Sequence, residues 1–207
     1  DMVASGKSIT AQAKNDIFVK HSIKTNNGAI VLTADYDADK SGAMKIDASL
    51  TGSDIDLDAG ETIDINASIT ASNKLEIFTQ KSIDVDSSMA AKTATLIAGE
   101  SISASGQITV QNSAILYADT GSISLAKANV GQQLYAASAS DSITLAGEVN
   151  VGGGSLLAKK NIIISGALST GNNSIGLIAS DLQLTGTLNS GSGTTSIMVN
   201  DGGSIGL

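Results

Sequence analysis

The strongest constraint on this chain is an internal repeat of about 20 residues. A short segment that alternates apolar and polar residues recurs, with starting positions separated by 20, 19, 21, 20, 19 and 20 residues. A near-constant step of this size indicates one structural unit per step, with each unit stacked on its neighbours. The same pattern extends backwards to Met44, Ile23 and Val3 and forwards to a new copy at 205–207. The clearest copies are residues 63–65, 83–85, 102–104, 123–125, 143–145, 162–164 and 182–184.

Each unit contains three short strand-like pieces. In one clear unit these pieces are residues 143–145, 149–151 and 155–158. Alternation at period two places Ile, Leu and Val on one face and Ser, Thr, Asp or Asn on the other. Gly-rich links such as 152–154 supply the turns. Because no segment has the 3.6-residue period of an amphipathic helix, the repeat predicts an all-β fold.

The predicted fold is a right-handed parallel β-helix, a solenoid of about ten turns with roughly 20 residues and three short strands per turn. Connections between parallel strands favour the right hand. A hexapeptide β-helix would show a six-residue period and a calcium β-roll would show Gly-Gly-x-Gly-x-Asp nonapeptides, and neither pattern occurs. We expect residues 1–207 to form one β-helix segment, and since 205–207 open another turn, a fragment of a longer repeat protein.

Composition restricts the partners of the chain. A net charge of −8 and a pI near 4.4 argue against nucleic acid or an anionic membrane as a partner. No apolar run approaches the roughly 20 residues of a membrane span, so membrane insertion is not expected. The chain has no cysteine, which excludes a disulfide framework and thiolate metal sites. The first residues show no signal peptide, so any secretion signal is expected upstream of them.

Three sequence segments resemble those of a known protein family. Residues 27–35 (Asn-Gly-Ala-Ile-Val-Leu-Thr-Ala-Asp), 122–126 (Ser-Ile-Ser-Leu-Ala) and 154–159 (Gly-Ser-Leu-Leu-Ala-Lys) are similar to segments of filamentous-haemagglutinin-type exoproteins of two-partner secretion systems. The resemblance covers essentially the whole chain, through motifs that are generic to aliphatic β-helices. The amino-terminal secretion domain of that family carries an Asn-Pro signature. This chain has no proline, so it resembles a shaft segment instead.

The resemblance implies a structural role. Members of this family are large secreted or surface-bound adhesins, cytolysins and contact-dependent toxins with long β-helical shafts. We therefore expect a shaft segment of an adhesin-like bacterial exoprotein, located outside the Gram-negative outer membrane. The implied partners are an outer-membrane transporter and, through the parent protein, a glycan or protein on a host or neighbouring cell. Adhesion follows from the resemblance alone.

One irregular segment, residues 35–42, interrupts the repeat and predicts a protruding acidic loop. From Asp37 onwards it has the oxygen spacing and the Gly turn of the first half of a calcium loop. The second half fails, because its ninth position is Lys45 and its twelfth is Ala48, so the bidentate acidic ligand is missing. The open alternatives are a partial calcium site and a solvated acidic loop, and no other cofactor is expected. The candidate calcium ligands are Asp35, Asp37, Asp39 and Ser41.

Outward-facing carboxylates form a second candidate site. Alternation around Ile55 and Leu57 turns the neighbouring carboxylates outward. The 20-residue register stacks Lys45, Asp64 and Asp84 in one column, and the next column holds Asp47, Asn66 and Asp86. This acidic face is either a cation- or carbohydrate-binding surface or a device for solubility that opposes sheet association. Its candidate binding residues are Asp54, Asp56, Asp58, Asp64, Asp84 and Asp86.

A polysaccharide-active enzyme or a phage-tailspike-like protein is a further alternative, because right-handed β-helices also host such proteins. Sugar-cleaving sites combine carboxylate pairs with aromatic platforms and irregular loops that build a cleft. This chain has only five aromatic residues and one histidine, His21, without an evident nucleophile partner. No convergent set of catalytic residues is evident, so we expect a protein that is not an enzyme. The aromatic residues are Phe18, Tyr36, Phe78, Tyr117 and Tyr135.

Overall fold

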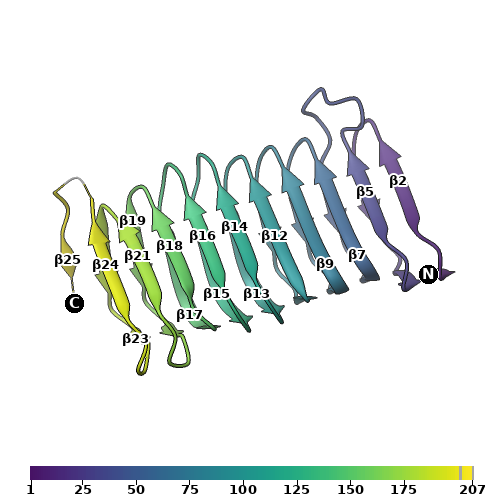
Figure 1. The fold of residues 1–207 in the computed structure, drawn as a ribbon. Helices are drawn as coiled ribbons and strands as arrows, with labels where there is room; N and C mark the ends of the chain where they lie inside the picture. The colour runs from purple at the N-terminus through teal and green to yellow at the C-terminus, as the bar shows by residue number, and fades with distance from the viewer. Residues whose placement is uncertain (201, 207) are drawn as a thin grey trace.

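The chain folds into a parallel β-solenoid of about ten turns (Figure 1). The computed structural model describes residues 1–200 and 202–206, and within them it contains 25 strands and no helix. Each turn contributes three strand segments, so three ladders of parallel strands run along the length of the solenoid. We name them ladders A, B and C in the order in which the chain crosses them within a turn. Five strands run across a corner and belong to two ladders each: β7 (Leu50–Ala59), β9 (Ile69–Thr79), β13 (Ile102–Val110), β15 (Ile123–Val130) and β17 (Ile143–Val151).

The three ladders contain the following strands. Ladder A consists of β3 (Ile17–Val19), β6 (Met44–Ile46), β8 (Ile63–Ile65), β10 (Ile83–Val85), the first parts of β13 (Ile102–Val110), β15 (Ile123–Val130) and β17 (Ile143–Val151), β19 (Asn161–Ile164), β22 (Asp181–Leu184) and β25 (Ile205–Gly206). Ladder B consists of β1 (Met2–Ser5), β4 (Ile23–Asn26), the first parts of β7 (Leu50–Ala59) and β9 (Ile69–Thr79), β11 (Met89–Ala91), the second parts of β13, β15 and β17, β20 (Ala167–Ser169) and β23 (Thr187–Asn189). Ladder C consists of β2 (Ile9–Ala13), β5 (Ile30–Ala34), the second parts of β7 and β9, β12 (Thr93–Ala98), β14 (Ala114–Ala118), β16 (Leu134–Ser138), β18 (Gly154–Ala158), β21 (Ile175–Ala179) and β24 (Thr195–Val199).

The register confirms the repeat that the sequence predicts. Ile83 pairs with Ile63 on one side and with Ile102 on the other, so equivalent residues of successive turns lie directly above one another. Their side chains point into the solenoid and are fully buried. With parallel strands about 4.8 Å apart, each turn adds one thin aliphatic layer to a continuous core. Burying an aliphatic side chain of this size stabilises the fold by about 1.5–3 kcal/mol, so stacked Ile, Leu and Val hold the turns together without aromatic rings.

The extrapolation of the repeat towards the N-terminus is wrong by one ladder. Met44 pairs with Ile17, 27 positions earlier, and does not share a ladder with Ile23. Ile23 instead pairs with Leu50 in ladder B, and Val3 lies in the same ladder. The cause is the loop after β5, which lengthens this turn beyond the usual 19–21 residues and shifts the count.

At the other end of the chain, Ile205 pairs with Leu182 and begins a further turn as predicted. Leu207, the last residue of that predicted copy, lies outside the described residues. Within the described residues, no helix has the length and the apolar character needed to span a membrane.

Candidate functional site

The predicted acidic loop links β5 to β6 and rises above the other turns of the solenoid (Figure 1). The backbone adopts positive φ at Asp35 (80°), Ala38 (58°), Lys40 (67°) and Gly42 (102°). Its two ends continue the ladder hydrogen bonds, since the Tyr36 N–H donates to the carbonyl of Ala13 (2.9 Å) and the Gly42 carbonyl accepts from the Glu61 N–H (2.9 Å). The loop is therefore anchored at both ends on the neighbouring turns.

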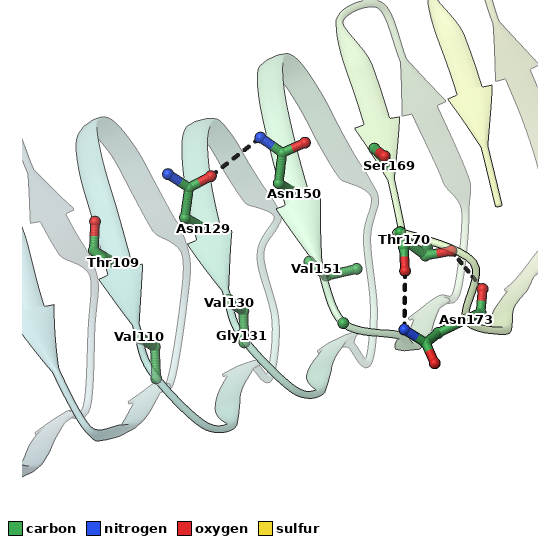
Figure 2. Close-up of a pocket in the computed structure, with 12 residues that line it drawn as sticks. Thr109, Val110, Asn129, Val130, Gly131, Asn150, Val151, Ser169, Thr170 and Asn173 are labelled. Atoms are coloured by element: carbon green, nitrogen blue, oxygen red, sulfur yellow. Dashed lines mark hydrogen bonds between the residues drawn. The ribbon is translucent and has the colours of Figure 1, made fainter. Parts of the chain in front are cut away.

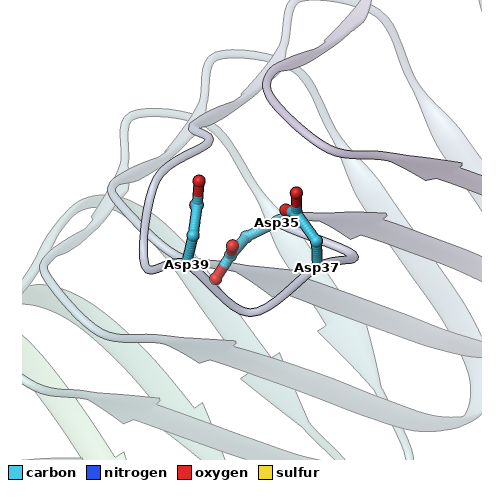
Figure 3. A group of neighbouring side chains, drawn as sticks. All are labelled: Asp35, Asp37 and Asp39. Atoms are coloured by element: carbon cyan, nitrogen blue, oxygen red, sulfur yellow. The ribbon is translucent and has the colours of Figure 1, made fainter.

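The loop brings three predicted ligands together. The side chains of Asp35, Asp37 and Asp39 are grouped on the loop (Figure 3), and each can offer one carboxylate oxygen so that these atoms lie within 4.8 Å of one another. Each carboxylate also has a partner within the protein. Asp35 accepts from the Lys40 N–H (3.2 Å), and Asp37 forms an exposed ion pair with Lys14 (3.5 Å).

The fourth predicted ligand, Ser41, is engaged with Asp39. Both its N–H (2.9 Å) and its hydroxyl donate to the Asp39 carboxylate. These two hydrogen bonds lower the pKa of Asp39 below its ordinary value, and the bond from the hydroxyl has the larger effect. Calcium takes six to eight oxygen ligands, roughly twice what the three carboxylates supply with one oxygen each. Lys45, at the ninth position of the incomplete motif, lies in β6 instead of in the loop. Calcium binding at this loop stays a prediction.

The outward carboxylates lie on two different ladders instead of on one face. Asp54, Asp56 and Asp58 belong to the ladder C part of β7. Asp64, Asp84 and Asp86 lie in ladder A or directly after it, on β8 and β10. The stacked column that the sequence predicts in ladder A is present, because Lys45 pairs with Asp64 and Asp64 pairs with Asp84. The structure therefore divides the predicted acidic face into two smaller patches.

Partial burial, followed by the proximity of like charges, raises the pKa of three of these carboxyl groups. Partial burial and then the carboxylates of Asp64 and Asp86 raise the pKa of Asp84 above its ordinary value. Burial and then Glu76 raise the pKa of Asp56, and burial followed by Asp56 and Asp35 raises the pKa of Asp58. These groups resist ionisation more than a solvated Asp does, but they remain partly exposed.

Other carboxylates are satisfied by polar side chains of the next turn. The Asn66 side-chain amide donates to Asp47 (2.9 Å), the Asn73 amide donates to Asp54 (2.7 Å), and the Ser105 hydroxyl donates to Asp86 (2.8 Å). Lys74 forms an ion pair with Glu76 (2.8 Å) on the same strand. Of the six predicted binding residues, Asp54 and Asp86 thus accept hydrogen bonds from polar side chains of the next turn.

A shallow groove of about 530 Å³, lined by both polar and apolar residues, lies at the corner between ladders B and C (Figure 2). Thr109, Asn129, Asn150 and Ser169 occupy successive turns of one outward column beside it. The Asn150 amide donates to the Asn129 side-chain carbonyl (3.1 Å), and at the end of the groove the Thr170 hydroxyl donates to the Asn173 carbonyl. The groove offers amide and hydroxyl groups, and no aromatic residue lines it.

Ladder C also carries an apolar surface that was not predicted from the sequence pattern. Outward positions of seven successive turns hold an almost continuous apolar column, which we call the ladder C stripe. The signal was present in the sequence, where ladder C segments such as 96–98 and 114–118 are apolar at consecutive positions instead of alternating. The stripe consists of Phe78, Ile97, Tyr117, Ala137, Leu157, Ile178 and Met198.

The ladders, the buried aliphatic column and the parallel register define the chain as a β-solenoid repeat protein. No protein-family model, curated protein or solved structure matches this chain.

Proposed function

We propose that this chain is a shaft segment of a large adhesin-like bacterial exoprotein, of the filamentous-haemagglutinin-like type secreted by a two-partner system. The observation that supports the proposal is the continuity of the three ladders, which run from turn to turn with one long insertion, the loop after β5. A solenoid of this kind is extended by adding turns, because each turn contacts only its neighbours. Ten turns at about 4.8 Å each give a rod roughly 45–50 Å long.

The proposed location is the exterior of the Gram-negative outer membrane, with an outer-membrane transporter as the secretion partner. The rod spaces a binding region of the parent protein away from the cell, and that region recognises a glycan or protein on another cell surface. The sequence fits folding after export, because the chain contains neither proline nor cysteine. Its folding therefore involves no X–Pro isomerisation and no disulfide pairing, two of the slow steps of protein folding.

Carbohydrate binding is a second candidate function, and the row of polar side chains in the groove beside Asn129 and Asn150 supports it. Amide and hydroxyl groups in a row suit the hydroxyl groups of a sugar chain. The groove has no aromatic platform among its lining residues, which makes it a weaker basis than the continuous ladders are for a shaft.

Removal of one whole turn tests the shaft proposal. Deleting residues 123–142 joins Ser122 to Ile143, and it recreates the Ser142–Ile143 junction of the intact chain. We expect a folded rod with unchanged circular dichroism and a length in solution scattering shorter by about 4.8 Å. The matched control deletes residues 123–132, half a turn, which puts strands of different ladders in line and should prevent folding.

A glycan panel separates the shaft from the alternatives. For the shaft, we expect the intact chain neither to bind nor to cleave neutral and anionic polysaccharides. Binding that Asn150→Ala removes would assign carbohydrate recognition to the groove. Cleavage of any polysaccharide would contradict the shaft proposal and support the enzyme alternative.

A further inference from the structure

The outer face of ladder C carries large apolar side chains that the described residues of the chain leave exposed. Phe78, Leu157 and Met198 of the ladder C stripe are 41%, 37% and 57% exposed. The adjacent outward column adds Ile115 (44%) and Tyr135 (42%). Three of the five aromatic residues of the chain therefore lie on this one face, and its strands form the nearly parallel row in the foreground of Figure 1.

The outward positions of the other ladders have a different character. Their columns are mainly polar, as in Asp84, Ser103 and Ser124 of ladder A, or Asn129 and Asn150 of ladder B. A contiguous apolar patch of several hundred Å² on one face of a protein marks an interaction site. The exposed apolar residues of ladder C therefore mark this face as a candidate interaction surface.

We propose that the ladder C stripe binds a second copy of this chain, with the two rods antiparallel and packed face to face. The twofold axis runs along the strand direction at Ala137. Rotation about this axis reverses the direction of the rod but preserves the direction of the strands. Each outward column therefore faces the same column of the other copy. Each turn then faces the turn that lies equally far on the opposite side of Ala137.

The order of residues within the stripe is compatible with this symmetry. Ala137 has three large apolar residues on each side, one per turn. The twofold axis places Tyr117 of one copy opposite Leu157 of the other, Ile97 opposite Ile178, and Phe78 opposite Met198. A hollow of about 240 Å³ lies over Ala137, bordered by Tyr117, Tyr135 and Leu157 and, towards the later turns, by Lys159 and Asn200. Large residues of the facing copy can enter this hollow.

The positions of two charged residues independently favour a twofold axis at Ala137. The first outward position after each ladder C strand is Asp119 in the turn before Ala137 and Lys159 in the turn after it. The twofold axis at Ala137 brings Asp119 of each copy opposite Lys159 of the other, which creates two ion pairs at the edge of the apolar contact. In the adjacent outward column, the large Ile115 faces the small Ser155 of the other copy. Charge and shape are therefore complementary in the same register.

The area of the face fits a weak dimer. Six steps of about 4.8 Å give a length of about 29 Å, and five strand residues at about 3.3 Å give a width of about 17 Å. The planar area is then about 500 Å² per copy, or about 1,000 Å² in total. Specific interfaces of this size lie at the low end of the observed range and are transient. A sugar chain is a less suitable occupant, because most of the stripe is aliphatic instead of aromatic.

Sedimentation velocity of the intact chain over a wide concentration range tests the proposal. We expect a reversible dimer at high concentration that Leu157→Asp abolishes, with circular dichroism unchanged because Leu157 points outward. Phe18→Ser is the matched control. It removes an apolar residue that is even more exposed (58% against 37%) from ladder A and should leave the dimer intact.

Charge reversal tests the register. Asp119→Lys and Lys159→Asp should each weaken the dimer at least tenfold, because each places like charges opposite one another. An equimolar mixture of the two variants should recover dimerisation, since opposite charges meet again in the mixed pair. Lys127→Asp, on ladder B, is the control that should change nothing. If the intact chain stays monomeric at every concentration, the proposal is overturned. This holds also if the monomer binds glycans through the stripe. A dimer that is insensitive to both reversals overturns the antiparallel register.

Discussion

Asp64 and Asp84 are direct register partners on β8 and β10, so two carboxylates of ladder A stack one above the other. At a strand spacing of about 4.8 Å, their repulsion in water amounts to about 1 kcal/mol at most. Burial and the neighbouring carboxylates of Asp64 and Asp86 raise the pKa of Asp84 in the folded state. The folded protein therefore holds a proton on Asp84 more tightly than the unfolded chain does.

The sign of the pH effect follows from this raised pKa. The unfavourable contribution of Asp84 is fully present at neutral pH, and it declines as the pH falls through the folded pKa towards 3.8, the ordinary value. We expect Asp84→Asn to raise the free energy of unfolding at pH 7 by up to about 1 kcal/mol. The advantage should shrink towards pH 4 in urea titrations. An advantage that grows on acidification would contradict this assignment.

Asp181 provides the contrast of opposite sign. The N–H (2.8 Å) and hydroxyl (2.9 Å) of Ser204 donate to its carboxylate and lower the pKa of Asp181. Its favourable contribution is present above the unfolded pKa and is lost as the pH falls through the folded pKa. We expect Asp181→Asn to destabilise the protein at pH 7, with a penalty that vanishes in acid. The same urea titrations measure both variants, and a stabilised Asp181→Asn protein would show that the Ser204 hydrogen bonds contribute nothing.

A glycine at the corner between ladders A and B allows two turns to approach closely. A Cβ atom on Gly166 would lie 2.0 Å from the carbonyl oxygen of Gly147 in the preceding turn. We expect Gly166→Ala to destabilise the fold by about 1–3 kcal/mol or more, because backbone must move. Gly176 is the matched control, since a Cβ there meets only Ser155 Cβ at 3.8 Å. Thermal melting of Gly176→Ala should show a gain of about 0.5–1 kcal/mol. Equal losses in both variants would rule out close approach as the cause.

The ladders were predictable because each turn repeats the same alternation, so that a single buried column such as Ile63, Ile83 and Ile102 determines the register of its neighbours. The count failed at Ile23, where the loop after β5 inserts extra residues that periodicity alone cannot assign to a ladder. The prediction of a single acidic face failed for a related reason. Alternation shows that Asp56 and Asp84 both point outward, but it does not show which of the three ladders each one occupies.

The ladder C stripe escaped the sequence analysis because an apolar outward residue looks the same as a core residue in a consecutive apolar run. Leu156 and Leu157 are adjacent in β18, yet Leu156 is fully buried and Leu157 is exposed. We expect Leu156→Ala to cost about 2–5 kcal/mol. Leu157→Ala should cost about 1 kcal/mol or less at concentrations where the protein is monomeric. Chemical denaturation of both variants measures the difference, and similar losses would contradict the assigned strand orientation.

The loop after β5 can be removed without disturbing the ladders. Ten positions separate Ala34 from Met44, whereas four separate the equivalent Ala59 and Ile63 in the next turn. Deletion of residues 36–41 makes the two connections equal in length. We expect a folded rod with a melting temperature within a few degrees of the original, because a surface loop of this length contributes little to stability. Loss of the cooperative transition would show that the loop is part of the fold.

The same deletion tests the loop as a calcium site. Asp35, Asp37 and Asp39 are already engaged by Lys40, Lys14 and Ser41, and they supply too few oxygens for calcium without further ligands. We therefore expect millimolar calcium to leave the melting temperature of the intact chain and of the deletion variant unchanged. A ligand that binds the folded state alone raises the melting temperature in proportion to its occupancy. A rise in the intact chain that is absent from the deletion variant would therefore establish calcium binding at this loop.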